Sequence, residues 1–219
     1  MKSVKRLNEP QSLKQNAAVW TQELLNEIAR LGNYSKVSDS FKGKYNQIDV
    51  KTELAKMYNN RCCYCEGALG EQTYGRIEHL KPKSLPQFYD LTFVWDNLHW
   101  SCEICNTNKG KKWNSKFPIL DPTKDDIDDH IRLNVDSGEY EIINGSRRGE
   151  TTIEHTQMNR CKLVEARQKV AFRIKKNFLR KDEKDRKKYL EETLADAEEF
   201  RYPCVVIETC NLLEQLLRG

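Results

Sequence analysis

Apolar residues near the start of the chain recur at the spacing of α-helices. One helical face is formed by Trp20, Leu24, Ile28 and Leu31. Gly32 follows directly, where a helix commonly ends in a left-handed residue. After a polar loop that reaches to about residue 47, Asp49 can cap a shorter helix that ends at residues 59–60. The apolar face of this second helix consists of Val50, Leu54, Met57 and Tyr58.

The middle of the chain, residues 61–113, predicts a strand, a loop, a second strand and a helix. Residues 76–80 have the composition of a short strand, which Pro82 stops. Residues 94–98 predict a second strand or a turn, and residues 106–109 predict the beginning of a helix.

The last third of the chain predicts a hairpin followed by helices. Residues 131–135 and 140–142 alternate around a turn. Thr151 and Glu154 form a possible capping box that opens a helix, and Pro203 interrupts the helical pattern. The helical apolar positions are Leu163, Val170, Ile174, Phe178, Leu190, Leu194 and Ala197, and a last short helix carries Val206, Cys210, Leu213 and Leu217.

These elements predict an α+β protein with a small ββα core inside a mostly helical frame. We expect three regions: a helical lead at 1–60, the core at 61–119, and a hairpin with C-terminal helices at 120–219. The 219 residues are 32% charged with a mean hydropathy of −0.80. No apolar run approaches the roughly 20 residues that span a bilayer. The basic start lacks an apolar region behind it, so we expect no secretory signal, no membrane contact and a cytoplasmic location.

The eight cysteines include two Cys-x-x-Cys pairs. Cys62 and Cys65 form the first pair, Cys102 and Cys105 form the second, and 36 residues lie between them. In a reducing cytosol this spacing predicts a four-thiolate zinc site. Four-coordinate zinc binds no substrate, so its role is to join two loops. The other four cysteines are expected to be small buried hydrophobic residues: Cys63, Cys161, Cys204 and Cys210.

Glu78 and His79 lie between the two cysteine pairs. Neutral imidazole can take a proton from water near pH 7, and a carboxylate can hold a hard divalent cation. Neighbouring residues of an ideal strand point to opposite faces, so the two can share a site only where the strand twists or ends.

Two asparagines add to this pattern. Asn106 directly follows Cys105, which would fix its amide oxygen as a second cation ligand; Asn108 is an alternative. Asn97 could brace the loop and orient His79. Each asparagine alone is typical of a turn or a helix cap.

The combined pattern resembles the HNH nuclease family with its ββα-metal fold. The matching segments are residues 62–66, 76–84, 95–98 and 101–110. The resemblance implies that His79 is the general base, that Glu78 stands where many members have Asp, and that Asn97 takes the middle position. It also implies that Asn106 stands at the last position of the motif, where other members have His or Asn. Glu78 and Asn106 would then hold a catalytic Mg²⁺ or Mn²⁺ beside the structural Zn²⁺.

Residues 41–45 and 120–126 extend the resemblance to the PtuB branch, the HNH component of Septu and of some retron anti-phage systems. That branch implies a partner ATPase and, in retrons, a reverse transcriptase with its RNA–DNA product. The expected function is phosphodiester cleavage in nucleic acid, with DNA favoured because a single-metal site needs no 2′-hydroxyl. Cleavage of RNA or tRNA is one alternative. A zinc-knuckle adaptor that only binds nucleic acid or a protein is the other.

A net charge of +4 permits nucleic-acid binding without requiring it. Basic residues near the site can contact phosphates or simply face solvent: Arg76, Lys81, Lys83, Lys109, Lys111 and Lys112. The basic run at 162–188 is typical of a solvated helix face, with docking of nucleic acid or a partner as the alternative. The acidic residues at 125–129 are typical of turns and helix starts.

Overall fold

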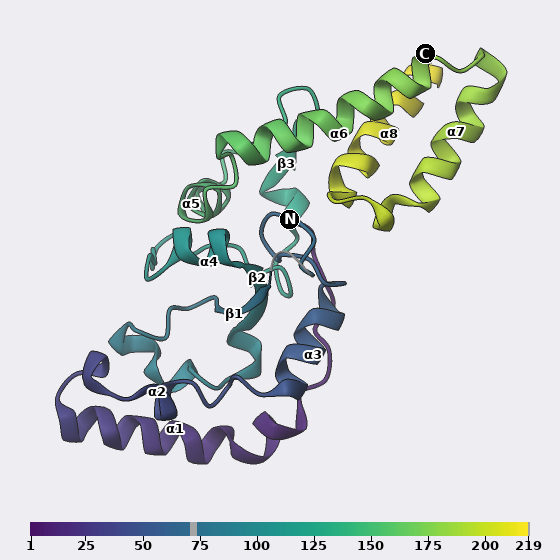
Figure 1. Cartoon of the computed structure of the whole chain (residues 1–219). Helices are drawn as coiled ribbons and strands as arrows, with labels where there is room; N and C mark the ends of the chain where they lie inside the picture. Colours follow the sequence, from purple (N-terminus) through teal and green to yellow (C-terminus); the bar gives the residue numbers. More distant parts are fainter. Residues whose placement is uncertain (71–73, 219) are drawn as a thin grey trace.

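Figure 1 shows the computed structural model, which describes residues 1–70 and 74–218. The chain is a mixed α+β protein in which helices surround two small antiparallel sheets. The helix α1 lies at one end of the molecule, an arm of three helices forms the other end, and the first sheet lies between them (Figure 1). The expected α+β class is thereby confirmed, whereas the three-region division stays a prediction.

The two predicted N-terminal helices are confirmed as α1 (Gln11–Leu31) and α3 (Ile48–Met57). Gly32 ends α1 with a φ of 71°, which is the left-handed conformation that glycine adopts without strain. The predicted cap at Asp49 is wrong, because α3 begins one residue earlier and Asp49 reaches sideways to α1. Its carboxylate accepts hydrogen bonds from the Ser12 amide at 2.8 Å and the Ser12 hydroxyl at 2.7 Å. The loop between these helices contains a short helix, α2 (Asp39–Lys42).

The first sheet pairs β1 (Gly75–His79) with β2 (Leu98–Cys102), and α4 (Glu103–Lys109) follows β2 without a connecting loop. The strands are antiparallel, with His79 opposite Leu98. Of the strand or turn predicted at 94–98, the structure has a 3₁₀ turn at Trp95–Asn97, and the strand begins only at Leu98. The Cys102 side chain caps α4, so this helix begins before the predicted start at 106.

The predicted hairpin is confirmed as β3 (Ile131–Leu133) and β4 (Tyr140–Ile142). The capping box at Thr151 is wrong, because α5 (Arg147–Thr156) begins a turn earlier. Its cap is Ser146, whose hydroxyl oxygen accepts a hydrogen bond from the Gly149 amide at 3.0 Å. Thr151 instead bonds the Arg147 carbonyl inside the helix.

The helical arm consists of α6 (Cys161–Leu179), α7 (Glu183–Ala195) and α8 (Pro203–Arg218). The chain turns after Leu179 and again after α7. The arm therefore consists of three separate helices, and no single helix runs on to Pro203. Pro203 opens α8, where the missing amide hydrogen of proline costs nothing. A cluster of buried side chains joins the three helices: Ile174, Phe178, Leu190, Val206, Cys210 and Leu213.

A larger hydrophobic core occupies the rest of the molecule and contains Leu24, Tyr64, Phe93, Leu98 and Ile131. Of the four spare cysteines, Cys63 and Cys210 are buried as expected, Cys204 is partly buried, and Cys161 is exposed at the start of α6. Among the helices of the described residues, none has the length and apolar content needed to cross a membrane.

Gly75 at the start of β1 lies against the ring of Trp100 on β2, and a Cβ atom there would overlap that ring. We expect Gly75→Ala to lower the free energy of unfolding by about 1–3 kcal/mol, because the sheet must open to admit one methyl group. Among the described residues, no atom lies within 4 Å of a Cβ built on Gly70, so Gly70→Ala serves as the matched control. Urea unfolding of both variants tests this, and equal stabilities would contradict the close approach.

Candidate functional site

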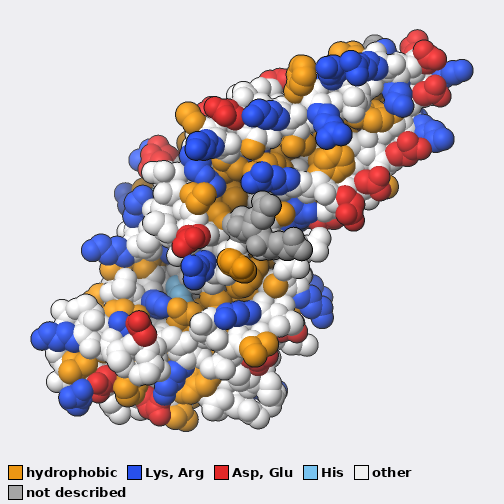
Figure 2. All heavy atoms as spheres, in the orientation of Figure 1, with side chains coloured by type: hydrophobic (Ala, Val, Ile, Leu, Met, Phe, Trp, Pro, Cys, Tyr) orange, Lys and Arg blue, Asp and Glu red, His pale blue; other side chains and the backbone are white. Residues whose placement is uncertain are grey.

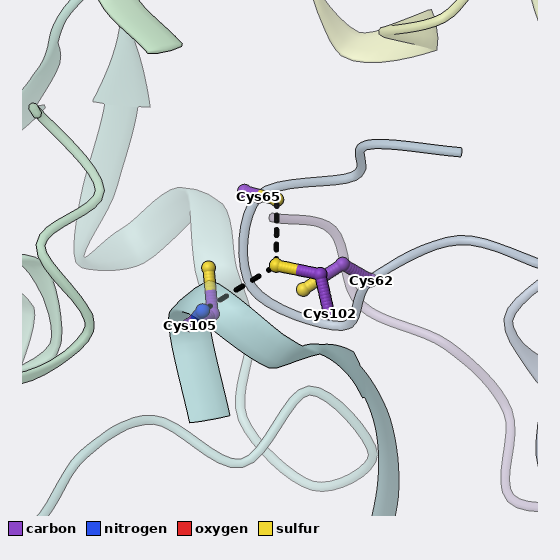
Figure 3. Close-up of side chains that lie close together, drawn as sticks. All are labelled: Cys62, Cys65, Cys102 and Cys105. Carbon is purple, nitrogen blue, oxygen red and sulfur yellow. Dashed lines mark hydrogen bonds between the residues drawn. The ribbon is translucent and has the colours of Figure 1, made fainter. Parts of the chain in front are cut away.

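The two cysteine pairs meet at the base of α4. Cys62 and Cys65 lie on the loop after α3, whereas Cys102 ends β2 and Cys105 lies in the first turn of α4 (Figure 3). All four thiols are buried, and their sulfur atoms lie within 4.8 Å of one another. The Sγ atoms of Cys65 and Cys102 are 3.9 Å apart. Tetrahedral zinc with Zn–S bonds of about 2.3 Å separates its sulfurs by about 3.8 Å, so the cluster could hold a zinc ion.

Hydrogen-bond donors surround these sulfurs. The Cys105 amide lies 3.4 Å from the Cys102 Sγ, and Nη1 of Arg160 lies 3.5 Å from the Cys105 Sγ. Four thiolates around a divalent ion carry two excess negative charges, which such donors partly neutralise. Arg160 precedes α6, so this contact joins the helical arm to the cysteine cluster. Sequence reasoning missed Arg160, because no motif points to a partner 55 positions from Cys105.

A cavity of about 430 Å³ opens between the end of β1, the following loop and α4. Its lining includes six residues that the sequence singles out: Arg76, Glu78, His79, Lys83, Asn106 and Lys109. Glu78 and His79 share this cavity because they are the last residues of β1, where the strand ends. Asn97 and Asn108 are not in the lining.

The imidazole of His79 is held in one orientation. Its Nε2 lies 2.9 Å from the Thr92 carbonyl oxygen, which can only accept, so Nε2 carries the proton and Nδ1 has the lone pair. The Tyr45 ring packs edge-on at 4.6 Å between ring centroids. Burial, and then the charge of Lys83, hold the pKa of His79 well below its usual value. The ring is therefore neutral near pH 7 and can accept a proton at Nδ1.

Glu78 is buried and has a charged partner. Its Oε1 lies 2.6 Å from the Lys109 ammonium and 3.3 Å from the Tyr64 hydroxyl. Burial raises the pKa of Glu78, and the ion pair with Lys109 opposes this rise. Lys109 also donates to the His79 carbonyl at 2.7 Å. These two partners leave the third N–H of the ammonium for another acceptor, and the predicted contact between Lys109 and nucleic acid stays a prediction.

Asn97 holds together two points of the connection between β1 and β2. Its Oδ1 accepts from the Lys81 amide at 2.8 Å, and its Nδ2 donates to the carbonyls of Lys81 at 3.0 Å and Leu91 at 3.1 Å. The second of these carbonyls belongs to the residue before Thr92, which orients His79. Asn97 thus acts on the imidazole through the loop and does not touch the cavity.

Asn106 and Asn108 are separated by the geometry of α4. Asn106 lies on the side of the helix that lines the cavity, and its Nδ2 is 3.5 Å from the Ser101 hydroxyl. This weak bond leaves its amide oxygen available to a ligand. Of the two asparagines, Asn106 therefore has the position that the resemblance requires.

The other basic residues that could contact phosphates differ in their exposure and in their hydrogen-bond or ion-pair partners. Lys83 is half-buried, donates to the Tyr45 hydroxyl and lies 4.2 Å from the centroid of that ring. Burial, and then the nearby charge of Lys42, lower the pKa of Lys83 to about 8. Arg76 is exposed and pairs with Glu103 at 3.2 Å. Three further lysines face solvent near the cavity or beyond α4: Lys81, Lys111 and Lys112. On the face shown in Figure 2, Lys and Arg side chains are scattered among Asp and Glu, including on the arm.

The fold and the site together define a mixed α+β protein whose ββα unit is joined to a preceding loop by four clustered thiols. No sequence model of a known protein family matches the chain. The chain is similar to two proteins named Septu protein PtuB. The one from Bacillus mycoides (strain KBAB4) is 32% identical over 155 residues, covering 58% of this chain and 52% of that protein. The one from Bacillus thuringiensis is 34% identical over 157 residues, covering 71% and 54%. The chain spans about half the length of each of these two Septu proteins.

The cysteine cluster predicts that zinc binding depends on Cys65 but not on its neighbour Cys63, which is also buried and lies outside the cluster. We expect Cys65→Ser to abolish tight zinc binding and to lower the free energy of unfolding by several kcal/mol, because the metal joins two distant loops. Cys63→Ser should retain about one zinc ion per chain. Metal analysis with thermal unfolding tests both; zinc retained in Cys65→Ser would contradict the four-thiolate site.

Proposed function

We propose that this protein is a divalent-metal-dependent HNH endonuclease that cleaves phosphodiester bonds in nucleic acid, with DNA as the favoured substrate. One observation carries the proposal. A neutral histidine, fixed in one tautomer by the Thr92 carbonyl, shares a cavity with the oxygen donors Glu78 and Asn106 beside a zinc-binding cluster. This combination supplies a base for water and ligands for a hard cation in one place.

The donors in the cavity fit Mg²⁺ or Mn²⁺. Both ions prefer oxygen ligands, and Mg²⁺ keeps several waters, so it needs only one or two protein groups. Glu78 and Asn106 offer a carboxylate and an amide oxygen. When bound there, the cation would stabilise the negative charge that develops on the phosphate and the departing oxygen.

The protein's own groups account for the rest of the reaction. Nδ1 of His79 takes a proton from a water molecule, and the water oxygen attacks phosphorus as a P–O ester bond breaks. The departing oxygen takes its proton from solvent. Lys83 and Arg76 present positive charge in the same cavity and can hold the phosphate without reading the base sequence. Asn97 acts as a positioning residue, because it holds the loop that carries Thr92.

The biological setting follows from the similarity to the two Septu proteins. We propose that the chain is the effector of a Septu-type anti-phage system in the cytoplasm, controlled by a PtuA-like ATPase. In a retron version of such a system, the partners include a reverse transcriptase and its RNA–DNA product. Control by a partner fits a nuclease that must stay inactive in a healthy cell.

Cleavage of plasmid DNA and of total tRNA by the purified chain tests the proposal, with Mg²⁺ or Mn²⁺ and with or without the PtuA-like partner. We expect metal-dependent nicking of DNA. His79→Ala should lower the rate at least about a hundredfold, because it removes the base. Asn106→Ala should lower it strongly and Asn108→Ala only slightly, since only Asn106 lines the cavity.

The zinc content of each variant is the control for folding. Preferential cleavage of tRNA would change the substrate to RNA. An absence of cleavage under every condition, with zinc retained, would favour the non-enzymatic adaptor, and so would a rate that survives in His79→Ala.

A further inference from the structure

Lys109 is the last residue of α4, and its ammonium lies between two oxygens of β1. It is 2.6 Å from the Glu78 carboxylate and 2.7 Å from the His79 carbonyl. The side chains of Lys109 and Glu78 are only 1% and 4% exposed. Removing one partner of an ion pair so shielded from water would leave the other as an uncompensated buried charge, which is costly. A positive charge of the protein itself thus lies beside the carboxylate that we assign to the catalytic cation.

The charges around the cavity are already balanced, apart from one lysine. Lys109 neutralises Glu78, and Glu103 pairs with Arg76 at 3.2 Å. Within residues 1–70 and 74–218, Lys83 has no carboxylate partner and donates to the Tyr45 hydroxyl. The imidazole of His79 is neutral. The cavity of the free protein therefore has an excess of positive charge, which favours an anion and opposes a divalent cation.

We propose that Lys109 competes with the divalent cation for Glu78, so that the free protein binds the metal weakly and the metal enters together with a phosphate of the substrate. This inference rests on the proposed nuclease function and adds an order of binding to it. A phosphodiester in the cavity brings one negative charge, which offsets part of the positive charge of Lys109, Lys83 and the cation. Because Lys109 also lines the cavity, it can share its charge with a phosphate oxygen.

Linkage then requires a reciprocal effect. If the phosphodiester raises the affinity for the metal, the metal must raise the affinity for the phosphodiester by the same factor. Lys109 is the residue that sets this coupling, since without it Glu78 would be a buried carboxylate with no cation of its own. A divalent ion could then satisfy Glu78 in the absence of nucleic acid.

The experiment measures Mn²⁺ binding by electron paramagnetic resonance on zinc-loaded protein, with and without a short DNA duplex. The parent is His79→Ala, which prevents cleavage. We expect the duplex to raise the Mn²⁺ affinity of the parent at least about tenfold. Adding Lys109→Met to the parent should raise its Mn²⁺ affinity in the absence of DNA by a similar factor. The duplex should then raise the Mn²⁺ affinity of this variant only slightly. The exposed Lys116 provides the control, since Lys116→Met should leave Mn²⁺ binding unchanged.

Glu78→Gln in the same parent should remove Mn²⁺ binding with or without DNA. The proposal is overturned if the duplex leaves the Mn²⁺ affinity of the parent unchanged, if the parent binds no Mn²⁺ even with the duplex, or if a folded Lys109→Met variant binds Mn²⁺ no better than the parent. If the Lys109→Met variant fails to retain zinc, the Mn²⁺ affinity of the parent with and without DNA still tests the proposal. Tight Mn²⁺ binding without DNA in a chain that does cleave DNA would remove the role of Lys109 and leave the nuclease function intact.

Discussion

The meeting of four buried thiols is the constraint on which the rest of the molecule depends. Cys102 and Cys105 lie at the junction of β2 and α4, and Cys62 and Cys65 come from the loop after α3. A two-stranded sheet and a helix of seven residues are each too small to be stable alone. The cluster joins them to the larger core and thereby fixes the side of α4 that carries Asn106 and Lys109. The position of the α4 side chains in the cavity follows from this junction.

The cavity illustrates how one buried environment gives neighbouring residues opposite properties. Burial favours the neutral form of His79, which suits a group that must accept a proton. The same burial would also neutralise Glu78, but Lys109 supplies the charge that opposes this. A cation at the end of α4 also interacts favourably with the negative end of the helix dipole. The site therefore has a neutral imidazole and a carboxylate on neighbouring residues, and both are buried.

The sequence predicts the parts of this structure that depend on local pattern or on strong motif chemistry. The helical face of α1, its end at Gly32, the hairpin and the cysteine cluster are of this kind. Element boundaries that depend on tertiary contacts were wrong: Asp49 bonds Ser12 on another helix, and Ser146 caps α5 in place of Thr151. Contacts such as Lys109 with Glu78 and Arg160 with Cys105 join residues 31 and 55 positions apart in sequence, and neither pair forms a spacing that marks a motif.

The contact between Arg160 and Cys105 has a consequence for how such a protein can change over evolutionary time. A guanidinium from the arm shares the charge of a sulfur that belongs to the core. An arm taken from another protein, without an arginine at this place, would leave the sulfur without this donor and would weaken the binding of the zinc ion that the cluster could hold. Most surface residues of the arm and of the core can therefore change independently. A change at Arg160, in contrast, affects the cysteine cluster of the core.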